Sequence, residues 1–215
     1  MPASLAAKKA AERRHEQRQT MFPHVPDDEV WTRLKNKGWT TIPRPWPSIA
    51  QVMDRLSKDK PISQVFLDLW CCGWDSPFVD VSNERERAFA CGWGGQRGAE
   101  VWRERVRILE RLGFLYTKSG AKGTFQHILI VNPYLAIARH CVARRAGLDE
   151  TTISALLERC IEYGSDEFKS LLAALKAGKR SATPVEPQSI LTALADKPHA
   201  PSTAKVVKVG RRKAP

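Results

Sequence analysis

Apolar residues recur at helical spacing between residues 96 and 112, and the neighbouring elements are arranged around this stretch. At about 100° per residue, apolar side chains fill one half of the helical circumference and charged side chains fill the other half. Gly113 ends the pattern where a left-handed helix cap is favoured. We therefore expect an amphipathic helix from Gln96 to Leu112. Its buried half would comprise Ala99, Val101, Trp102, Val106, Ile108, Leu109 and Leu112.

One charged residue, Arg105, falls inside the apolar half of this helix. An unpaired guanidinium is costly to bury. We therefore expect Arg105 to extend its charged end to the surface or to pair with a carboxylate such as Asp80 or Glu84.

Shorter elements surround the amphipathic helix. Asn83 is a favourable cap for a helix that ends at Ala90, and the glycine-rich run 91–95 breaks that helix. Alternating apolar and polar residues, followed by aromatic and β-branched residues, predict strands on either side of the helices. The expected order is a helix from Pro61 or Ser63, a strand at 76–82, helices at 83–90 and 96–112, a strand at 114–117, a loop at 118–123 and a strand at 125–131.

Helix, turn, helix and then a β-hairpin with lysines at its tip is the element order of winged helix-turn-helix DNA-binding proteins. Residues 61–132 resemble this family in that order of elements, without a motif of fixed residues. The resemblance implies a mainly α fold with a small β-hairpin. It also implies a winged-helix domain over 61–133, with the remaining segments attached to it.

The other segments are expected to serve as appendages. Residues 1–20 form a basic N-terminal arm, either folded along phosphates or simply solvated, and 21–60 form a Pro/Trp-rich strap and helix packed on the core. Within the strap we expect a short helix at 27–36 and an extended run Pro43–Pro47, which would be a strap or a peptide for a partner. Residues 134–180 predict C-terminal helices that form a homodimer surface or pack on their own domain. Residues 181–215 predict a disordered basic tail.

Charge then narrows the choice of partner. The net charge of +12 favours nucleic acid first and an acidic membrane surface second. Residues 1–20 hold five Lys or Arg against two Glu, and 181–215 hold six against two acidic residues. Much of the basic charge therefore lies in the tails and not in the central region.

The amphipathic helix and the hairpin supply the candidate DNA-binding residues. A recognition helix enters the major groove with its N-terminal residues nearest the bases. Arginine matches guanine, glutamine matches adenine, and glutamate can accept from cytosine. The same alternation of Arg and Glu would also stabilise a solvated helix without DNA. The candidate base readers are Gln96, Arg97, Glu100 and Arg103, with Arg107, Arg111, Lys118 and Lys122 nearer to phosphate.

Other chemistry finds less support in the sequence. The five cysteines form an odd set without a C-x-x-C pair, which favours a reducing cytoplasm and buried free thiols over a zinc site. The glycine-rich run lacks the Gly-Lys-Ser/Thr ending of a P-loop, and no hydrolase or metalloprotease motif is present. We expect no metal, no cofactor, no catalytic residue and no membrane-spanning segment.

Two functions follow from these expectations. The first is a non-catalytic, sequence-specific protein that binds double-stranded DNA, such as a transcriptional regulator or a plasmid or phage replication or maintenance factor. The second is a non-catalytic subunit of a protein or ribonucleoprotein assembly, in which the winged helix serves as a docking surface. The steep fall of DNA affinity with salt would distinguish them.

Overall fold

The computed structural model describes residues 5–26, 29–30, 37–58, 60–73, 76–144 and 148–178. The chain divides into two compact units, Met1–Ile42 and Pro43–Pro215. The first unit contains one helix, α1 (Leu5–Met21), in which alanine and charged residues alternate without an apolar stripe. The expected helix at 27–36 falls mostly outside the described residues, and the expected tail at 181–215 falls wholly outside them.

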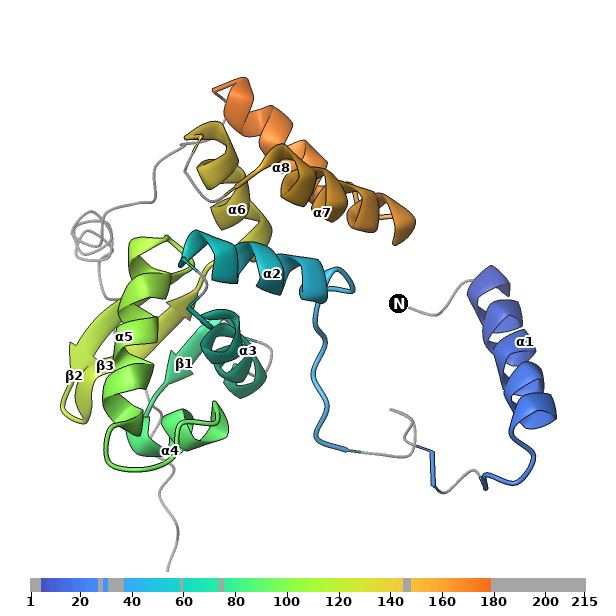
Figure 1. The fold of residues 1–215 in the computed structure, drawn as a ribbon, viewed down its shortest axis with the longest axis horizontal. Coiled ribbons are helices and arrows are strands. Elements are labelled where there is room, and N and C mark those ends of the chain that lie inside the picture. Colours follow the sequence, from blue (N-terminus) through green and yellow to red (C-terminus); the bar gives the residue numbers. More distant parts are fainter. Residues whose placement is uncertain are drawn as a thin grey trace, which may run out of the picture. The chain divides into compact units, whose positions relative to one another are not determined.

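The second unit is mainly helical and includes a small antiparallel sheet (Figure 1). Its elements follow the expected order of helix, strand, two helices, two strands and trailing helices. They are α2 (Trp46–Leu56), α3 (Ser63–Cys72), β1 (Phe78–Asp80), α4 (Glu84–Ala90), α5 (Gly98–Arg111), β2 (Leu115–Gly120), β3 (Gly123–Ile130), α6 (Pro133–Val142), α7 (Glu150–Glu162) and α8 (Glu167–Lys176).

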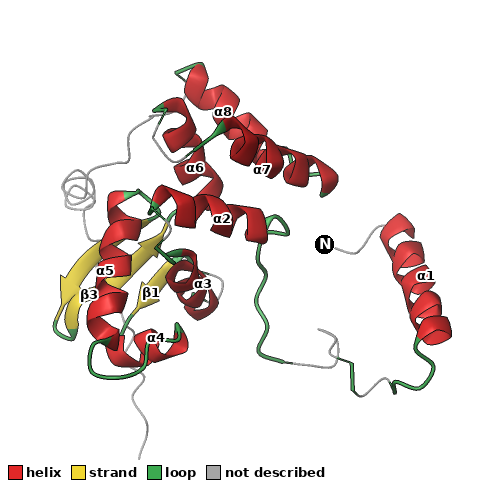
Figure 2. Ribbon diagram, viewed as in Figure 1, coloured by secondary structure: helices red, strands yellow, loops and turns green. Residues whose placement is uncertain are grey.

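The sheet has the strand order β1-β3-β2, and both pairings are antiparallel (Figure 2). Val79 of β1 lies opposite Ile128 of β3, and both side chains are buried. Because side chains alternate across a strand, the neighbouring positions face away from this core. One face of the sheet thus packs against helices, and the other face carries partly exposed side chains.

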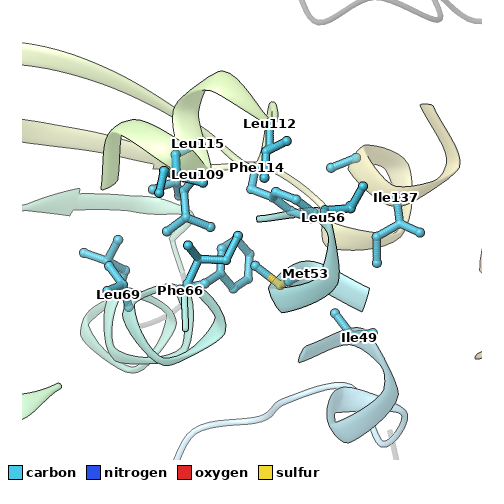
Figure 3. Packing of buried hydrophobic residues seen from close by; sticks show 14 of the residues in the cluster. Ile49, Met53, Leu56, Phe66, Leu69, Leu109, Leu112, Phe114, Leu115 and Ile137 are labelled. Carbon is cyan, nitrogen blue, oxygen red and sulfur yellow. The ribbon is translucent and has the colours of Figure 1, made fainter. Parts of the chain in front are cut away.

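A single hydrophobic cluster joins the helices to the inner face of the sheet (Figure 3). Phe66 of α3 lies at its centre, with its ring 6.1 Å from that of Phe114 and 5.8 Å from that of Trp46. Helix α5 contributes Trp102 and Leu109, which are both fully buried. This cluster fixes one face of α5 and leaves the opposite face for other contacts.

The C-terminal helices pack against one another and on α2. Ile137 of α6, Leu156 of α7 and Phe168 of α8 are fully buried in the same cluster. Asn132 caps α6 and also donates a 2.6 Å hydrogen bond to Glu167. These helices therefore pack on their own unit, which was one of the two alternatives, and a homodimer through them stays a prediction.

The proline-rich run Pro43–Pro47 was expected to be extended, and this expectation is wrong. The Trp46 N–H donates to the Pro43 carbonyl at 2.9 Å, and Trp46 begins α2. Its indole is only 9% exposed because it stacks on Phe66. Burial of the indole outweighs the preference of an alternating proline run for extended backbone. Pro47 lies in the first helical turn, where its missing N–H costs nothing.

The hairpin also differs from the expectation. A loop was expected at 118–123, but β2 continues to Gly120 and β3 begins at Gly123, so only Ala121 and Lys122 form the turn. Gly120 pairs directly with Gly123, and a Cβ on Gly120 would overlap the side-chain amide of Gln126. The glycines thus extend the strand pairing and shorten the loop.

Candidate nucleic-acid interface

Helices α4 and α5 meet at a glycine turn that sets their geometry. Asn83 begins α4 as predicted, and its side chain accepts from the Arg85 N–H at 3.1 Å. Gly95 has φ of +89°, a left-handed conformation that favours glycine. At Gly98 a Cβ would overlap the Trp93 carbonyl, so only glycine permits α5 to begin this close to the turn.

Helix α5 begins at Gly98, two residues later than predicted, and ends at Arg111. Gln96 and Arg97 therefore lie in the turn before the helix, with Arg97 at the N-cap position. A bond from the Gly98 N–H to the Gly95 carbonyl, 3.3 Å long, closes this turn. Both side chains are exposed at the N-terminus of the helix, which is the place expected for residues that contact a groove.

The predicted buried half of α5 agrees well with the structure. Trp102, Val106 and Leu109 are fully buried and Ile108 is 5% exposed, whereas Ala99 and Val101 are half-buried. The opposite face is in solvent and is not covered by the described parts of the chain. The exposed residues along it are Arg97, Glu100, Arg107 and Arg111.

Arg103 is placed differently from the other candidate base readers. Its Nε lies 2.5 Å from Glu84 Oε2, which joins α5 to the first residue of α4. The Glu84 side chain is only 12% exposed, whereas that of Arg103 is 42% exposed. Arg103 therefore compensates a nearly buried carboxylate through its Nε, which gives this side chain a role in holding α4 and α5 together.

Arg105 extends across the apolar half of α5 to a partner that was not expected. Its guanidinium lies 5.8 Å from the centre of the Trp93 ring and 3.1 Å from Glu104. The expected pairing with Asp80 or Glu84 is wrong, because Glu84 is occupied by Arg103 and Asp80 lies near Lys122. The Arg105 side chain is only 13% exposed. Its charge is stabilised by the Trp93 ring and by Glu104, whose side chain is 47% exposed.

The β2–β3 turn lies beside the N-terminal half of α5. Glu84, which pairs with Arg103, also approaches Gly123 at the end of the turn. Phe125 of β3 contacts Trp102, and the Arg107 guanidinium lies 5.5 Å over the Phe125 ring. Lys122 in the turn is exposed, and its ammonium lies 4.0 Å from Asp80, which also approaches His127 on the outer face of the sheet.

Lys118 does not lie at the tip as expected. It belongs to β2 and pairs with His127 of β3. The neighbouring Thr117 faces α5, because its hydroxyl donates to Glu110 at 2.5 Å. Since side chains alternate along a strand, Lys118 projects from the opposite face of the sheet. The alternation thus separates Lys118 from the candidate residues of α5, but not from Lys122, which lies near Asp80 on the same outer face.

One of the negative charges on the surface of α5 is balanced by a lysine from another part of the chain. Lys60, in the loop between α2 and α3, lies 2.5 Å from Glu104 Oε1. The hydrogen bond from Lys60 lowers the pKa of Glu104, which therefore stays ionised and paired. The sequence does not reveal this contact, because 44 residues separate the two partners. Glu100 remains as the exposed acid on this face.

A second surface was missed at the sequence level. The outer face of the sheet exposes Phe78 to 51% and Leu129 to 39%. Phe78 stacks on His127 with ring centres 5.9 Å apart, and Asp80 lies 3.3 Å from the same imidazole. The alternation of residues 76–82 contained the signal, since Phe78 and Asp80 share one side of the strand. This outer face is apolar at one end and charged at the other.

The cysteines are free thiols. Cys91 and Cys160 are buried, and burial raises the pKa of the Cys91 thiol to about 12. Cys72 is exposed and lies 2.6 Å from Arg87, which also pairs with Asp68 at 3.2 Å. In the part of the chain that the structure describes, no group of His, Cys, Asp and Glu is arranged to hold a metal ion.

The chain is thus a mainly helical protein with a small three-stranded antiparallel sheet. Comparisons with models of protein families, with curated proteins and with solved structures find no match. Within the described ranges, none of the helices combines the length and the apolar character that crossing a bilayer requires.

Proposed function

We propose that residues 61–133 form a winged helix-turn-helix domain and that the protein is a non-catalytic, sequence-specific binder of double-stranded DNA. The order α3-β1-α4-α5-β2-β3 supports the first part of this proposal, together with the sheet order β1-β3-β2. In that fold α5 is the recognition helix and the β2–β3 turn is the wing. Regulation of transcription and replication or maintenance of a plasmid or phage would use the same surface.

The observation that carries the proposal is the solvent-exposed face of α5 beside the lysine-bearing turn. Arg97, Arg107 and Arg111 are exposed on this face, and Lys122 is exposed at the turn. One of the neighbouring acids, Glu104, is already paired with Lys60. The surface is therefore cationic along its length, as a DNA backbone requires.

We expect different roles along this surface. Gln96 and Arg97 at the N-terminal end, with Glu100 one turn further, are positioned to read base edges in the major groove. Arg107 and Arg111 on later turns, and Lys122 on the turn, would contact phosphates. Lys118 projects from the outer face of the sheet and lies farther from the turn than Lys122, so we expect it to contribute less to DNA binding.

Selection of bound fragments from random genomic DNA, followed by fluorescence anisotropy on the selected duplex, tests the proposal. Arg97→Ala should weaken binding to the selected site by about 1 to 3 kcal/mol and relax its sequence preference, because arginine reads guanine by two hydrogen bonds. Lys122→Ala should weaken binding to all duplexes alike and reduce the dependence on salt. Lys118→Ala removes a lysine farther from the turn, serves as the matched comparison, and should weaken binding less than Lys122→Ala.

The proposal fails if the full chain selects no sequence, or if Arg97→Ala, Arg107→Ala and Lys122→Ala all bind duplex DNA as the unchanged protein does. An equal loss with Lys118→Ala would show that general charge, and not the α5 surface, governs binding. Titrations at salt concentrations between about 50 and 200 mM distinguish these outcomes. Each phosphate contact makes the fall of log affinity with log salt concentration steeper.

A second candidate function is a non-catalytic subunit of a protein or ribonucleoprotein assembly. The exposed outer face of the sheet favours it, because Phe78 and Leu129 present apolar surface to solvent. The Arg103–Glu84 pair favours it too, since it gives one candidate base reader a role in the fold that needs no DNA. Such a subunit would bind duplex DNA weakly and without sequence preference.

A further inference from the structure

The surface is hollowed beside the C-terminal half of α5. The hollow has a volume of about 410 Å³ and lies between the α2–α3 loop and the last turns of α5. This volume is within the range of pockets that hold small organic molecules. It is lined by Leu56, Ser57, Lys58, Lys60, Ile108, Arg111 and Leu112.

The floor and the rim of the hollow differ in chemistry. Leu56, Ile108 and Leu112 form an apolar floor, and they belong to the same hydrophobic cluster that holds α2 and α5 together. Lys58, Lys60 and Arg111 are exposed and form a cationic rim. An apolar floor under a cationic rim is complementary to a molecule with an apolar body and an anionic group.

The loop that carries the two lysines is held in place. Asp54 accepts from the N–H groups of Ile62 and Ser63 at 2.8 and 2.9 Å and from the Ser63 hydroxyl at 2.8 Å. The buried Ser57 hydroxyl lies 2.6 Å from the carbonyls of both Asp54 and Lys60. Hydrogen bonds therefore hold Ser57, Lys60, Ile62 and Ser63 on the two sides of the loop, which lowers the ordering cost of binding.

The charge of the rim is partly balanced within the protein. Glu104 pairs with Lys60, and the C-termini of α2 and α5 each contribute roughly half a negative charge. Neither Lys58 nor Arg111 forms an ion pair with any residue that the structure describes. Lys58 and Arg111 are therefore the two rim cations that can pair with an anionic group of a ligand.

We infer that this hollow is a binding site for a small organic monoanion with an apolar body, such as an aryl carboxylate or sulfonate. The apolar body lies on Leu56, Ile108 and Leu112, and the anionic group lies between Lys58 and Arg111. Lys58 and Arg111 also lie near the C-termini of α2 and α5, where a cation stabilises a helix without any ligand. That role alone does not require an apolar hollow between the two side chains. The hollow shares Arg111 with the proposed DNA-binding surface, so it is tested on the free protein, where the outcome does not depend on DNA binding.

Fluorescence titration of the full chain with two probes tests this inference. One probe is 8-anilinonaphthalene-1-sulfonate, and the other is the neutral N-phenyl-1-naphthylamine, which has the same aromatic body without the sulfonate. Lys58→Gln and Arg111→Gln should each weaken the anionic probe about three- to tenfold, as the loss of a partly exposed charge-assisted contact does. The neutral probe should bind these variants as it binds the unchanged protein.

Two further variants keep the test specific. Lys169→Gln on α8 removes an exposed cation away from the hollow and should change neither probe. Phe78→Ser removes the exposed aromatic ring of the outer sheet face and should leave the anionic probe bound. The inference is overturned if Lys58→Gln and Arg111→Gln leave the anionic probe unaffected, if both probes weaken equally, or if Phe78→Ser alone abolishes binding.

Discussion

At the scale of single residues, the decisive feature of the candidate interface is whether a charged side chain already has a partner inside the protein. Arg103 and Arg107 lie one helical turn apart on α5 and have the same chemistry. Arg103 pairs with the nearly buried Glu84, whereas Arg107 is exposed and lies over the Phe125 ring. The same residue type thus stabilises the fold at one position and remains available to a partner at the next.

This difference predicts opposite effects of two substitutions. Arg103→Ala should lower the free energy of unfolding by about 1 to 3 kcal/mol, because it leaves the Glu84 carboxylate poorly solvated and without its cation. Arg97→Ala should change stability by less than about 0.5 kcal/mol, since this side chain is exposed. Urea denaturation of both variants measures the difference. Equal stabilities would show that the ion pair contributes nothing.

A second prediction concerns Asp149, which caps α7 and accepts from the Thr152 N–H at 2.6 Å. Hydrogen bonds from Thr152, together with nearby Arg55, hold the pKa of Asp149 below its usual value. A carboxyl whose pKa is lowered by folding contributes stability above its unfolded pKa, and this contribution is lost as pH falls through the folded value. Stability should therefore decline below about pH 4, in part through this residue.

The Asp149→Asn variant isolates that contribution. Asparagine can still cap the helix but carries no charge to titrate. The thermal unfolding midpoint of the Asp149→Asn variant should fall less steeply between about pH 5 and pH 2 than the midpoint of the unchanged protein. Parallel pH curves for the two proteins would contradict the prediction.

At the scale of elements, helix α2 links the sheet-containing part of the unit to the C-terminal helices. Its inner face contacts α3, α6 and α7. Ile49, Val52 and Met53 are almost fully buried on this face, and Trp46 closes its N-terminal end. The segment around the proline-rich run therefore belongs to the core of the unit.

Trp46→Ala should lower the free energy of unfolding by about 3 to 5 kcal/mol, because a large aromatic side chain is removed from packed surroundings. Phe89→Ala is a matched aromatic control on α4, where the ring is 75% exposed, and should cost less than about 0.5 kcal/mol. Chemical denaturation distinguishes the two. A small effect at Trp46 would mean that α2 is not anchored through its N-terminal end.

At the scale of the whole molecule, the net charge of +12 is divided between the tails and the central region. Residues 181–215 hold six basic and two acidic residues, a net charge of +4. Charge of this kind attracts any phosphate backbone without reading its sequence. On the proposed function, tails and α5 surface thus make separable contributions to DNA binding.

Removal of residues 181–215 tests that separation. Affinity for all duplexes should fall and the salt dependence should become shallower, whereas the ratio of affinities for selected and random DNA should be retained. Anisotropy titrations at several salt concentrations measure both quantities. If the ratio of affinities for selected and random DNA were lost, sequence recognition would belong to residues 181–215 and not to α5.

The sequence predicted those features that depend on neighbouring residues. The apolar half of α5, the cap at Asn83 and the glycine break before Gly98 were all identified, because periodicity, capping and backbone freedom act within a few residues. Helix and strand boundaries shifted by a few residues, as at Gln96 and Lys118, where the turn and strand pairing were decided by contacts across the fold.

The sequence by itself determined that this protein is mainly helical, that one strongly amphipathic helix lies between a glycine turn and a hairpin, and that the tails are basic. Only the tertiary structure decided which charges remain available, because the partners of Arg103 and Lys60 lie 19 and 44 residues away. It also decided the face on which Lys118 projects, the burial of Trp46 and the hollow beside α5. These features arise where separate elements pack together, and no local pattern of residues encodes such a contact.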